Sequence, residues 1–291
     1  MIITSCGNSI TIAQSLAKKL KATYSPLTIS SFPDGDMYLK FNIALQGKTL
    51  VIVHSFQPHS DQSLVRIVFA AQTAKELGAA KVILVAPYLA YMRQDTRFHP
   101  GEAISSRIMA KLLNSSVDKI ITIDPHLHRY KSLKDIFTIP AVKLSANEIL
   151  AQYIKTHFKN EIIIGPGGES YQWAQDIAQR IHIQATVLHK TRFSSRKVAV
   201  KMVKPISIQG KNVVIVDDII STGHTIAEAA KQATKMGAKS ITAIGVHGLL
   251  VEGAMQKLRQ AGVTKVITTN CIEHPTNKID ITPLLVQALQ P

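Results

Sequence analysis

The sequence predicts an α/β protein with two tandem domains, each a mainly parallel sheet flanked by helices. Short apolar runs rich in β-branched residues alternate with amphipathic stretches, which is typical of parallel strands buried on both faces. The chain also repeats itself, because residues 2–20 resemble residues 163–181 without a gap. Residues 48–53 (KTLVIV) resemble residues 211–216 (KNVVIV) at nearly the same offset. We therefore expect two copies of one βα domain.

The expected elements follow this alternation in chain order. Strands are expected near residues 2–5, 49–54, 81–86, 119–123, 162–165, 212–217, 240–246 and 265–269. Helices are expected at 63–77, 103–114, 147–158 and 223–236, with a short terminal helix at 281–290. A boundary near residue 145 gives domains of 1–145 and 146–291, and binding residues should lie at the carboxyl ends of the strands.

Composition excludes several classes of protein. The best candidate for a membrane span, Val82 to Met92, is shorter than the ~20 residues required and contains Pro87, so no membrane association is expected. The start of the chain lacks the features of a secretion signal. The only cysteines, Cys6 and Cys271, cannot build a disulfide framework, which fits a reducing cytoplasm.

The net charge of +15 predicts anionic ligands. The basic residues are dispersed and form no stripe interleaved with aromatic residues, as a nucleic-acid binder would show. Small polyanionic substrates are therefore expected. Nonspecific nucleic-acid binding is an alternative that the pattern does not favour.

The stretch from Lys211 to Lys235 carries the sharpest functional signal. A buried apolar strand is followed by Asp217 and Asp218, and then by a small polar loop that leads into a helix. The loop consists of Ser221, Thr222, Gly223, His224 and Thr225. Its backbone N–H groups and the positive helix end form a phosphate cradle, while the carboxylates suit sugar hydroxyls or a divalent cation. The pattern indicates a sugar phosphate, and the alternative is an ordinary βα turn capped by aspartates.

The segment VVIVDDIISTGHT resembles the ribose-5-phosphate motif of phosphoribosyltransferases and of the ribose-phosphate pyrophosphokinase family. This resemblance implies two tandem phosphoribosyltransferase-like domains. Opposite Asp217 and Asp218, the first copy has His54 and Ser55, and no STG loop follows. We therefore expect ribose 5-phosphate to bind the second copy, through the acidic pair and residues 221–225, and the first copy to have lost the site.

Three segments of the first copy resemble nucleotide-binding and metal-binding segments of the same family. The turn FPDGD resembles F-S-D-G-E, which implies that Phe32, Asp34 and Asp36 contact adenine; by itself it would be interpreted as a solvated loop. PYLAYMRQD resembles P-Y-x-x-Y-x-R-Q-D, which implies that Arg93, Gln94 and Asp95 bind ATP, as arginines suit phosphates. The segment DPH resembles D-L-H, which implies that His126 contacts Mg²⁺.

A basic segment of the second copy, His189 to Arg196, follows the strand expected at 185–188 and precedes a hairpin strand at 197–202. It resembles the catalytic flexible loop K-x-R of the family. The resemblance implies that Lys190 and Arg192 stabilise the transition state, whereas the alternative is a solvated basic hairpin.

Two positions depart from the family pattern. Gly167 stands where the family has an Asp that helps to place ribose and metal, with Glu169 as a substitute two residues on. His224 replaces the second glycine of the phosphate loop.

The resemblance implies transfer of the β,γ-diphosphoryl group of ATP to the anomeric hydroxyl of ribose 5-phosphate, which gives 5-phosphoribosyl 1-diphosphate and AMP. It also implies a homo-oligomer, at least a dimer, in which the adenine turn of one subunit serves its neighbour. A phosphoribosyltransferase is an alternative, but the duplication, RQD and DPH count against it. A catalytically silent regulatory paralogue is another alternative, and Gly167 is the feature that favours it.

Overall fold

The computed structural model describes residues 1–159, 161–167, 170–192, 198–202 and 206–290, which form two units. The first unit contains residues Met1–Leu144, the short segment Cys271–Glu273 and the C-terminal segment from Ile281. The second contains Ser145–Asn270 and His274–Asp280. None of the helices in the described ranges is long and apolar enough to span a membrane.

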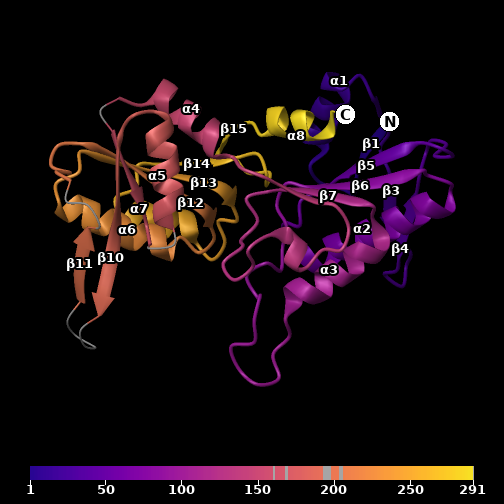
Figure 1. The fold of residues 1–291 in the computed structure, drawn as a ribbon, viewed down its shortest axis with the longest axis horizontal. Helices are drawn as coiled ribbons and strands as arrows, with labels where there is room; N and C mark the ends of the chain where they lie inside the picture. The colour runs from indigo at the N-terminus through magenta and orange to yellow at the C-terminus, as the bar shows by residue number, and fades with distance from the viewer. Residues whose placement is uncertain (160, 168–169, 193–197, 203–205, 291) are drawn as a thin grey trace. The chain divides into compact units, whose positions relative to one another are not determined.

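The first unit is built on a six-stranded sheet with the order β2-β1-β5-β6-β7-β8, in which every pair of neighbours is parallel. Its strands are β1 (Ile2–Ser5), β2 (Thr23–Tyr24), β5 (Thr49–Val53), β6 (Lys81–Ala86), β7 (Lys119–Ile123) and β8 (Ala141–Leu144). Helices α2 (Ser60–Glu76) and α3 (Ser105–Ser116) cover one face, and α1 (Ile10–Lys19) covers the other (Figure 1). The apolar runs of the central strands are buried between these layers, as their composition predicts.

The second unit repeats this arrangement. Its seven-stranded sheet has the order β11-β10-β9-β12-β13-β14-β15 within the described residues. The strands are β9 (Glu161–Gly165), β10 (Gln184–Arg192), β11 (Val198–Met202), β12 (Asn212–Ile220), β13 (Ser240–Gly248), β14 (Lys265–Thr269) and β15 (Asn277–Ile279). All neighbours are parallel except β10 and β11, a hairpin that extends away from the sheet (Figure 1).

Two helix pairs flank the second sheet. Helices α6 (His224–Lys235) and α7 (Ala254–Gln260) share a buried core with one face, to which Ile226, Ala230 and Leu258 belong. Helices α4 (Asn147–His157) and α5 (Tyr171–Arg180) pack together on the other side. The neighbours β9-β12-β13-β14 therefore repeat the neighbours β1-β5-β6-β7, and the expected α/β fold of two similar parallel sheets is confirmed.

The short strands at the edges were missing from the sequence-based expectation. Besides β2, β8 and β15, they include the antiparallel pair β3 (Thr28–Ser31) and β4 (Met37–Lys40), which forms a small separate sheet. The pair has a mixed pattern of half-buried and exposed residues and lacks a continuous apolar run. Periodicity therefore gave little sign of it.

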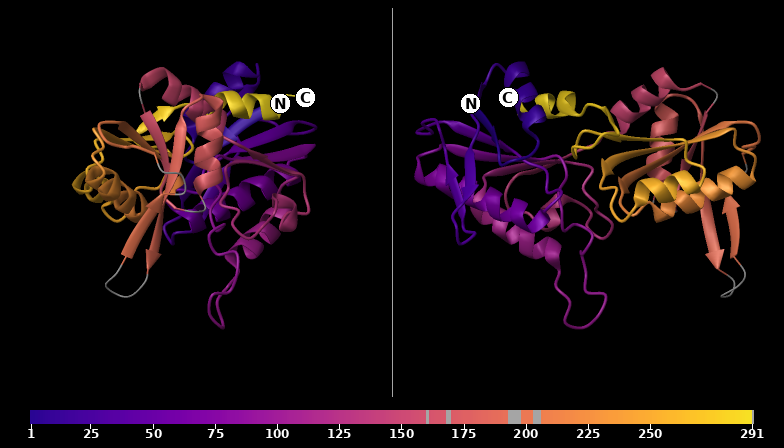
Figure 2. Two further views of the ribbon diagram at one scale, coloured as in Figure 1. Left: turned by 60° about the vertical axis from the view of Figure 1, so that its left-hand side comes forward. Right: turned by 180° about the vertical axis from the view of Figure 1, so that it is seen from behind.

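The end of the chain differs from the expected domain of 146–291. Cys271–Glu273 and the segment from Ile281 belong to the first unit, where α8 (Thr282–Leu289) packs beside α1 (Figure 2). The side-chain hydroxyl of Ser55 donates a hydrogen bond to the carbonyl oxygen of Cys271. Leu285 is fully buried, so α8 needs a partner surface, and the first unit supplies it.

Candidate functional site

The acidic pair of the second unit lies within strand β12. The expected strand ended at residue 217, but β12 continues to Ile220, and Asp217 pairs with Gly245 of β13. Strand β13 is equally long, so the ladder between the two strands extends past the apolar core. The carboxylate of Asp217 accepts the N–H of Asp218 at 3.2 Å, and that of Asp218 accepts the N–H of Ile219 at 2.8 Å. Both aspartates are half-buried at the carboxyl end of the sheet.

The loop after β12 ends at Gly223, which has a φ of 70° and precedes the first residue of α6. A Cβ atom at this position would lie 3.1 Å from the Leu258 side chain and 3.4 Å from the carbonyl oxygen of Ala254. Both the left-handed conformation and the close packing therefore favour glycine. The first N–H groups of α6 point out of the helix at this end, as a phosphate cradle requires.

Lys257 anchors the same loop from α7. Its Nζ donates a hydrogen bond of 2.8 Å to the carbonyl oxygen of Thr222. Two backbone bonds add to this anchor: Leu250 N–H donates to Ile220 and Val251 N–H donates to Ser221. Sequence reasoning missed Lys257, because only the packing of α7 beside α6 brings it to the loop.

Gly167 follows β9 at the same edge of the second sheet. Its N–H donates to the Ser170 hydroxyl at 3.1 Å, and that hydroxyl donates to the Gly167 carbonyl oxygen at 2.8 Å. A Cβ atom at Gly167 would have no neighbour within 4 Å. The backbone there leaves room for a side chain, so packing does not explain the glycine. Glu169, the suggested substitute, lies outside the described residues.

Lys190 and Arg192 lie in the part of β10 that pairs with β11. Their backbone partners are Val200 and Val198, respectively. The expected hairpin is thus present, although its first strand is longer than the expected 185–188. The side chains of both residues lie outside the described part of the structure.

In the first unit, the Arg93-Gln94-Asp95 segment follows β6 and is held by the start of α3. The N–H and the hydroxyl of Ser106 donate to the Gln94 carbonyl oxygen at 3.3 and 3.2 Å. The Ser105 hydroxyl donates to the Gln94 side-chain oxygen. Arg93 is exposed, whereas Asp95 is buried.

Tyr91 lies just before this segment and has a φ of 66°, which is rare for a bulky residue. Its hydroxyl donates a hydrogen bond to the carboxylate of Asp61 in α2. Burial and this carboxylate raise the pKa of Tyr91. The Tyr91 hydroxyl therefore stays protonated and can donate this hydrogen bond, which holds the start of the Arg93-Gln94-Asp95 segment in place.

The DPH segment follows β7, and Arg129 farther along the same loop contacts the Arg93-Gln94-Asp95 segment. The Asp95 carboxylate, whose side chain is 1% exposed, accepts a hydrogen bond of 2.7 Å from Arg129 Nη1. His126 is half-buried and its ring contacts that of His128, with centroids 3.6 Å apart. The structure thus links the loop that carries His126 to the Arg93-Gln94-Asp95 segment through Arg129.

Among the described residues, no group of three or more His, Cys, Asp or Glu side chains could hold a metal ion. Mg²⁺ commonly keeps several waters and binds through substrate phosphates with one or two protein ligands. The residues present fit an ion that arrives with a nucleotide, and His126 is the candidate ligand in the DPH segment.

The turn of Phe32, Asp34 and Asp36 connects β3 and β4. The Phe32 ring is 52% exposed and makes an edge contact with Tyr38, with centroids 5.8 Å apart. Gly35 has a φ of 94°, and the N–H of Asp36 binds the Asp34 carboxylate at 3.2 Å. The turn presents an aromatic ring and two acidic side chains to its surroundings.

The first unit has no acidic pair where the second has Asp217 and Asp218. His54 is fully buried, and neither ring nitrogen has a hydrogen-bond partner within the described residues. Burial and the nearby Arg66 lower the pKa of His54 to about 3, so the ring is neutral. The backbone N–H of Ser55 donates to Asn8 Oδ1 at 3.1 Å and to the Ser9 hydroxyl at 3.2 Å.

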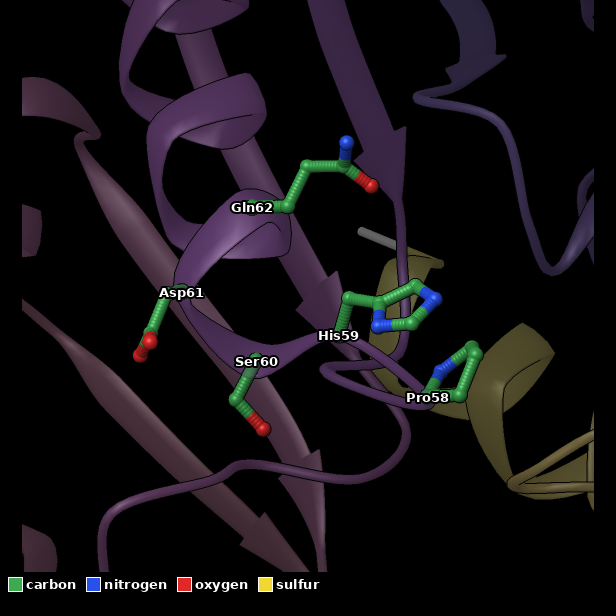
Figure 3. A pocket seen from close by; sticks show the side chains of 5 residues that line it. All are labelled: Pro58, His59, Ser60, Asp61 and Gln62. Carbon is green, nitrogen blue, oxygen red and sulfur yellow. The ribbon is translucent and has the colours of Figure 1, made fainter.

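A pocket lies at the start of α2, the helix that corresponds to α6. Figure 3 shows the side chains that line it, with Asp61 pointing away from His59 and Pro58. The lining residues are Pro58, His59, Ser60, Asp61 and Gln62. They include no glycine, whereas the loop after β12 contains Gly223.

Comparison with known proteins finds two family domains along the chain. Residues 1–116 match the family described as the N-terminal domain of ribose phosphate pyrophosphokinase, and residues 132–282 match the phosphoribosyl transferase domain. A ribose-phosphate pyrophosphokinase of Methanopyrus kandleri is 34% identical, over 100% of this chain and 99% of its own length. That of Saccharolobus solfataricus is 34% identical over 94% of this chain and 93% of its own.

A solved structure shows the same fold. The phosphoribosylpyrophosphate synthetase of Mycobacterium smegmatis has a TM-score of 0.86 and 25% identity, and the match covers 99% of this chain and 96% of that one. The resemblance found in the motifs is thereby confirmed over the whole length of the chain. This chain belongs to the ribose-phosphate pyrophosphokinase family.

Proposed function

We propose that the protein is an active ribose-phosphate diphosphokinase. It transfers the β,γ-diphosphoryl group of ATP to the anomeric hydroxyl of ribose 5-phosphate, which gives 5-phosphoribosyl 1-diphosphate and AMP. The observation that carries this proposal is the combination of Asp217 and Asp218 with the glycine-capped start of α6, found in the second unit and not in the first. Relatives named for this activity, at about a third identity over the full chain, support it.

Ribose 5-phosphate binds the second unit. The N–H groups of residues 221–225 and the positive end of α6 hold its 5-phosphate, with side chains from Ser221, Thr222, His224 and Thr225. Asp217 and Asp218 accept hydrogen bonds from the ribose hydroxyls or hold their metal. Lys257 keeps the loop in place through Thr222.

ATP binds through the loop after β6. Arg93 is the exposed member of the Arg93-Gln94-Asp95 segment and can meet a phosphate, while Gln94 and Asp95 are held by neighbouring protein groups. A magnesium ion held by His126 would neutralise phosphate charge. Lys190 and Arg192 stabilise the transferred group as catalytic residues, which makes positioning and charge neutralisation the main sources of catalysis.

The protein also self-associates, as a dimer or higher oligomer, and Phe32, Asp34 and Asp36 contact the adenine bound by a neighbouring subunit. The exposure of the Phe32 ring supports this role. Helices α2 and α3, which pack together, expose four large apolar side chains that support a subunit interface: Val65, Phe69, Ile108 and Leu112. The free cysteines Cys6 and Cys271 support a cytoplasmic location.

A second candidate is a catalytically silent regulatory paralogue, which Gly167 favours. Formation of AMP from MgATP, measured with and without ribose 5-phosphate, separates the two candidates. AMP that depends on ribose 5-phosphate, together with 5-phosphoribosyl 1-diphosphate, is the expected result. Binding of both ligands by calorimetry without any AMP would support the silent paralogue instead.

A further inference from the structure

We propose that Arg129 is a positioning residue of the nucleotide site, which it serves by locking the loop after β6 to the loop after β7. The first loop carries Arg93 and the second carries His126. The inference rests on the proposed function, because it assigns Arg129 to the ATP half of that reaction.

The main contact is the ion pair between Arg129 and Asp95. The carboxylate is almost completely buried, and Arg129 Nη1 lies 2.7 Å from its Oδ1. A buried carboxylate is costly unless a charged donor compensates it. Asp95 is therefore placed to hold Arg129 rather than to contact ATP, and the pair fixes the distance between the two loops.

Further contacts join the same two loops. The Arg129 guanidinium lies over the Phe98 ring, 5.1 Å from its centroid. The hydroxyl of the next residue, Tyr130, donates to the Asp95 carbonyl oxygen at 3.3 Å and lies 2.9 Å from the Ser106 hydroxyl. Residues 129 and 130 thus contact the β6 loop at the carboxylate and backbone of Asp95 and at the Phe98 ring. They also contact the start of α3 at Ser106.

The exposed position of Arg93 explains why this lock matters. Gln94 is held by α3 and Asp95 by Arg129, so both residues after Arg93 are anchored. These anchors limit the positions that the Arg93 side chain can reach. Release of Asp95 would loosen the loop, and the phosphate contact of Arg93 would weaken although Arg93 itself is unchanged.

The chemistry requires arginine and not merely a positive charge. A planar guanidinium can bind a carboxylate and stack on an aromatic ring at the same time, whereas a lysine ammonium is a point charge. Arg129→Lys should therefore restore only part of what Arg129→Gln removes.

The test is a double-mutant cycle of Arg129→Gln and Asp95→Asn, with kcat and KM measured for both substrates. Arg129→Gln should raise KM for ATP about tenfold, within the range of coupling between contacting residues, and leave KM for ribose 5-phosphate unchanged. In the Asp95→Asn background, Arg129→Gln should have almost no further effect. Arg107→Gln, an exposed arginine on α3, is the matched control and should change neither constant.

An unchanged KM for ATP in Arg129→Gln would overturn the inference, as would equal effects with and without Asp95. If Arg129→Gln does not fold, Arg129→Lys and the double variant, which lacks both charges, provide the same comparison. Calorimetric binding of ATP separates failure of the inference from failure of the proposed function. Unmodified protein that binds ATP without forming AMP contradicts only the function, whereas absence of ATP binding contradicts both.

Discussion

The carboxyl ends of β5 and β12 occupy equivalent places in the two units, but only the end of β12 carries the residues that we propose bind a sugar phosphate. The last part of β12 carries two half-buried aspartates, and a glycine-capped helix follows the strand. After β5 come a buried neutral histidine and Ser55, whose polar atoms bind the protein's own chain at Asn8, Ser9 and Cys271. The two sheets thus share a strand order, whereas the side chains at this edge differ in charge and in their partners.

The largest expected effect on activity comes from removing a charged side chain from the proposed site of the second unit. Asp218→Asn, and separately Lys190→Ala, should lower kcat at least about a hundredfold, because each removes a charge that positions or neutralises the reacting groups. Circular dichroism and thermal unfolding should match the unmodified protein. The control His54→Leu changes the equivalent edge of the first unit and should retain activity. Normal kinetics in both Asp218→Asn and Lys190→Ala would contradict the site assignment.

A smaller effect is expected at the glycine that starts α6. Gly223→Ala should destabilise the protein by about 1–2 kcal/mol, because an L residue resists the left-handed conformation, and it should also raise KM for ribose 5-phosphate. Gly253 is a matched control, since it starts α7 with the same φ of 70° but has no neighbour within 4 Å of its Cβ position. Gly253→Ala should share the loss of stability and leave KM unchanged. Equal KM values in the two variants would count against the phosphate loop.

The buried histidine of the first unit should make stability depend on pH. Because its pKa is about 3 in the folded protein and 6.5 ordinarily, the unfolded chain binds the extra proton. Above pH 6.5 the histidine should therefore not lower the free energy of unfolding. As the pH drops from 6.5 toward 3, the free energy of unfolding should fall by up to about 1.4 kcal/mol per pH unit. Chemical denaturation at several pH values should give a flatter profile for His54→Leu. Parallel profiles would show that this histidine is not responsible.

The smallest effect is expected at Gly167. Gly167→Asp introduces the family's carboxylate where a Cβ atom meets nothing within 4 Å, so stability should stay within about 0.5 kcal/mol. If the carboxylate helps to hold ribose or its metal, KM for ribose 5-phosphate should fall a few-fold. Steady-state kinetics at varied MgCl₂ would detect this gain. A higher KM would indicate that the site has adapted to the glycine.

Much of the fold could be predicted, because its signals are local. The alternation of apolar strands and amphipathic helices predicted both parallel sheets, and the internal repeat predicted their similar strand orders. The acidic pair and the STG loop likewise lie in one continuous segment. The edge strands β3, β4 and β15 were missed because they are short and lack a clear apolar pattern.

The sequence by itself determined the fold class, the duplication and the chemical difference between the two edges, since each depends on neighbours along the chain. Tertiary structure alone decided which distant residues support those edges. Lys257 reaches Thr222, Arg129 reaches Asp95, and α8 returns to the first unit, each only through the packing of separate elements. Periodicity reports which face of an element is buried, but not which element covers it, and so these contacts left no pattern in the sequence.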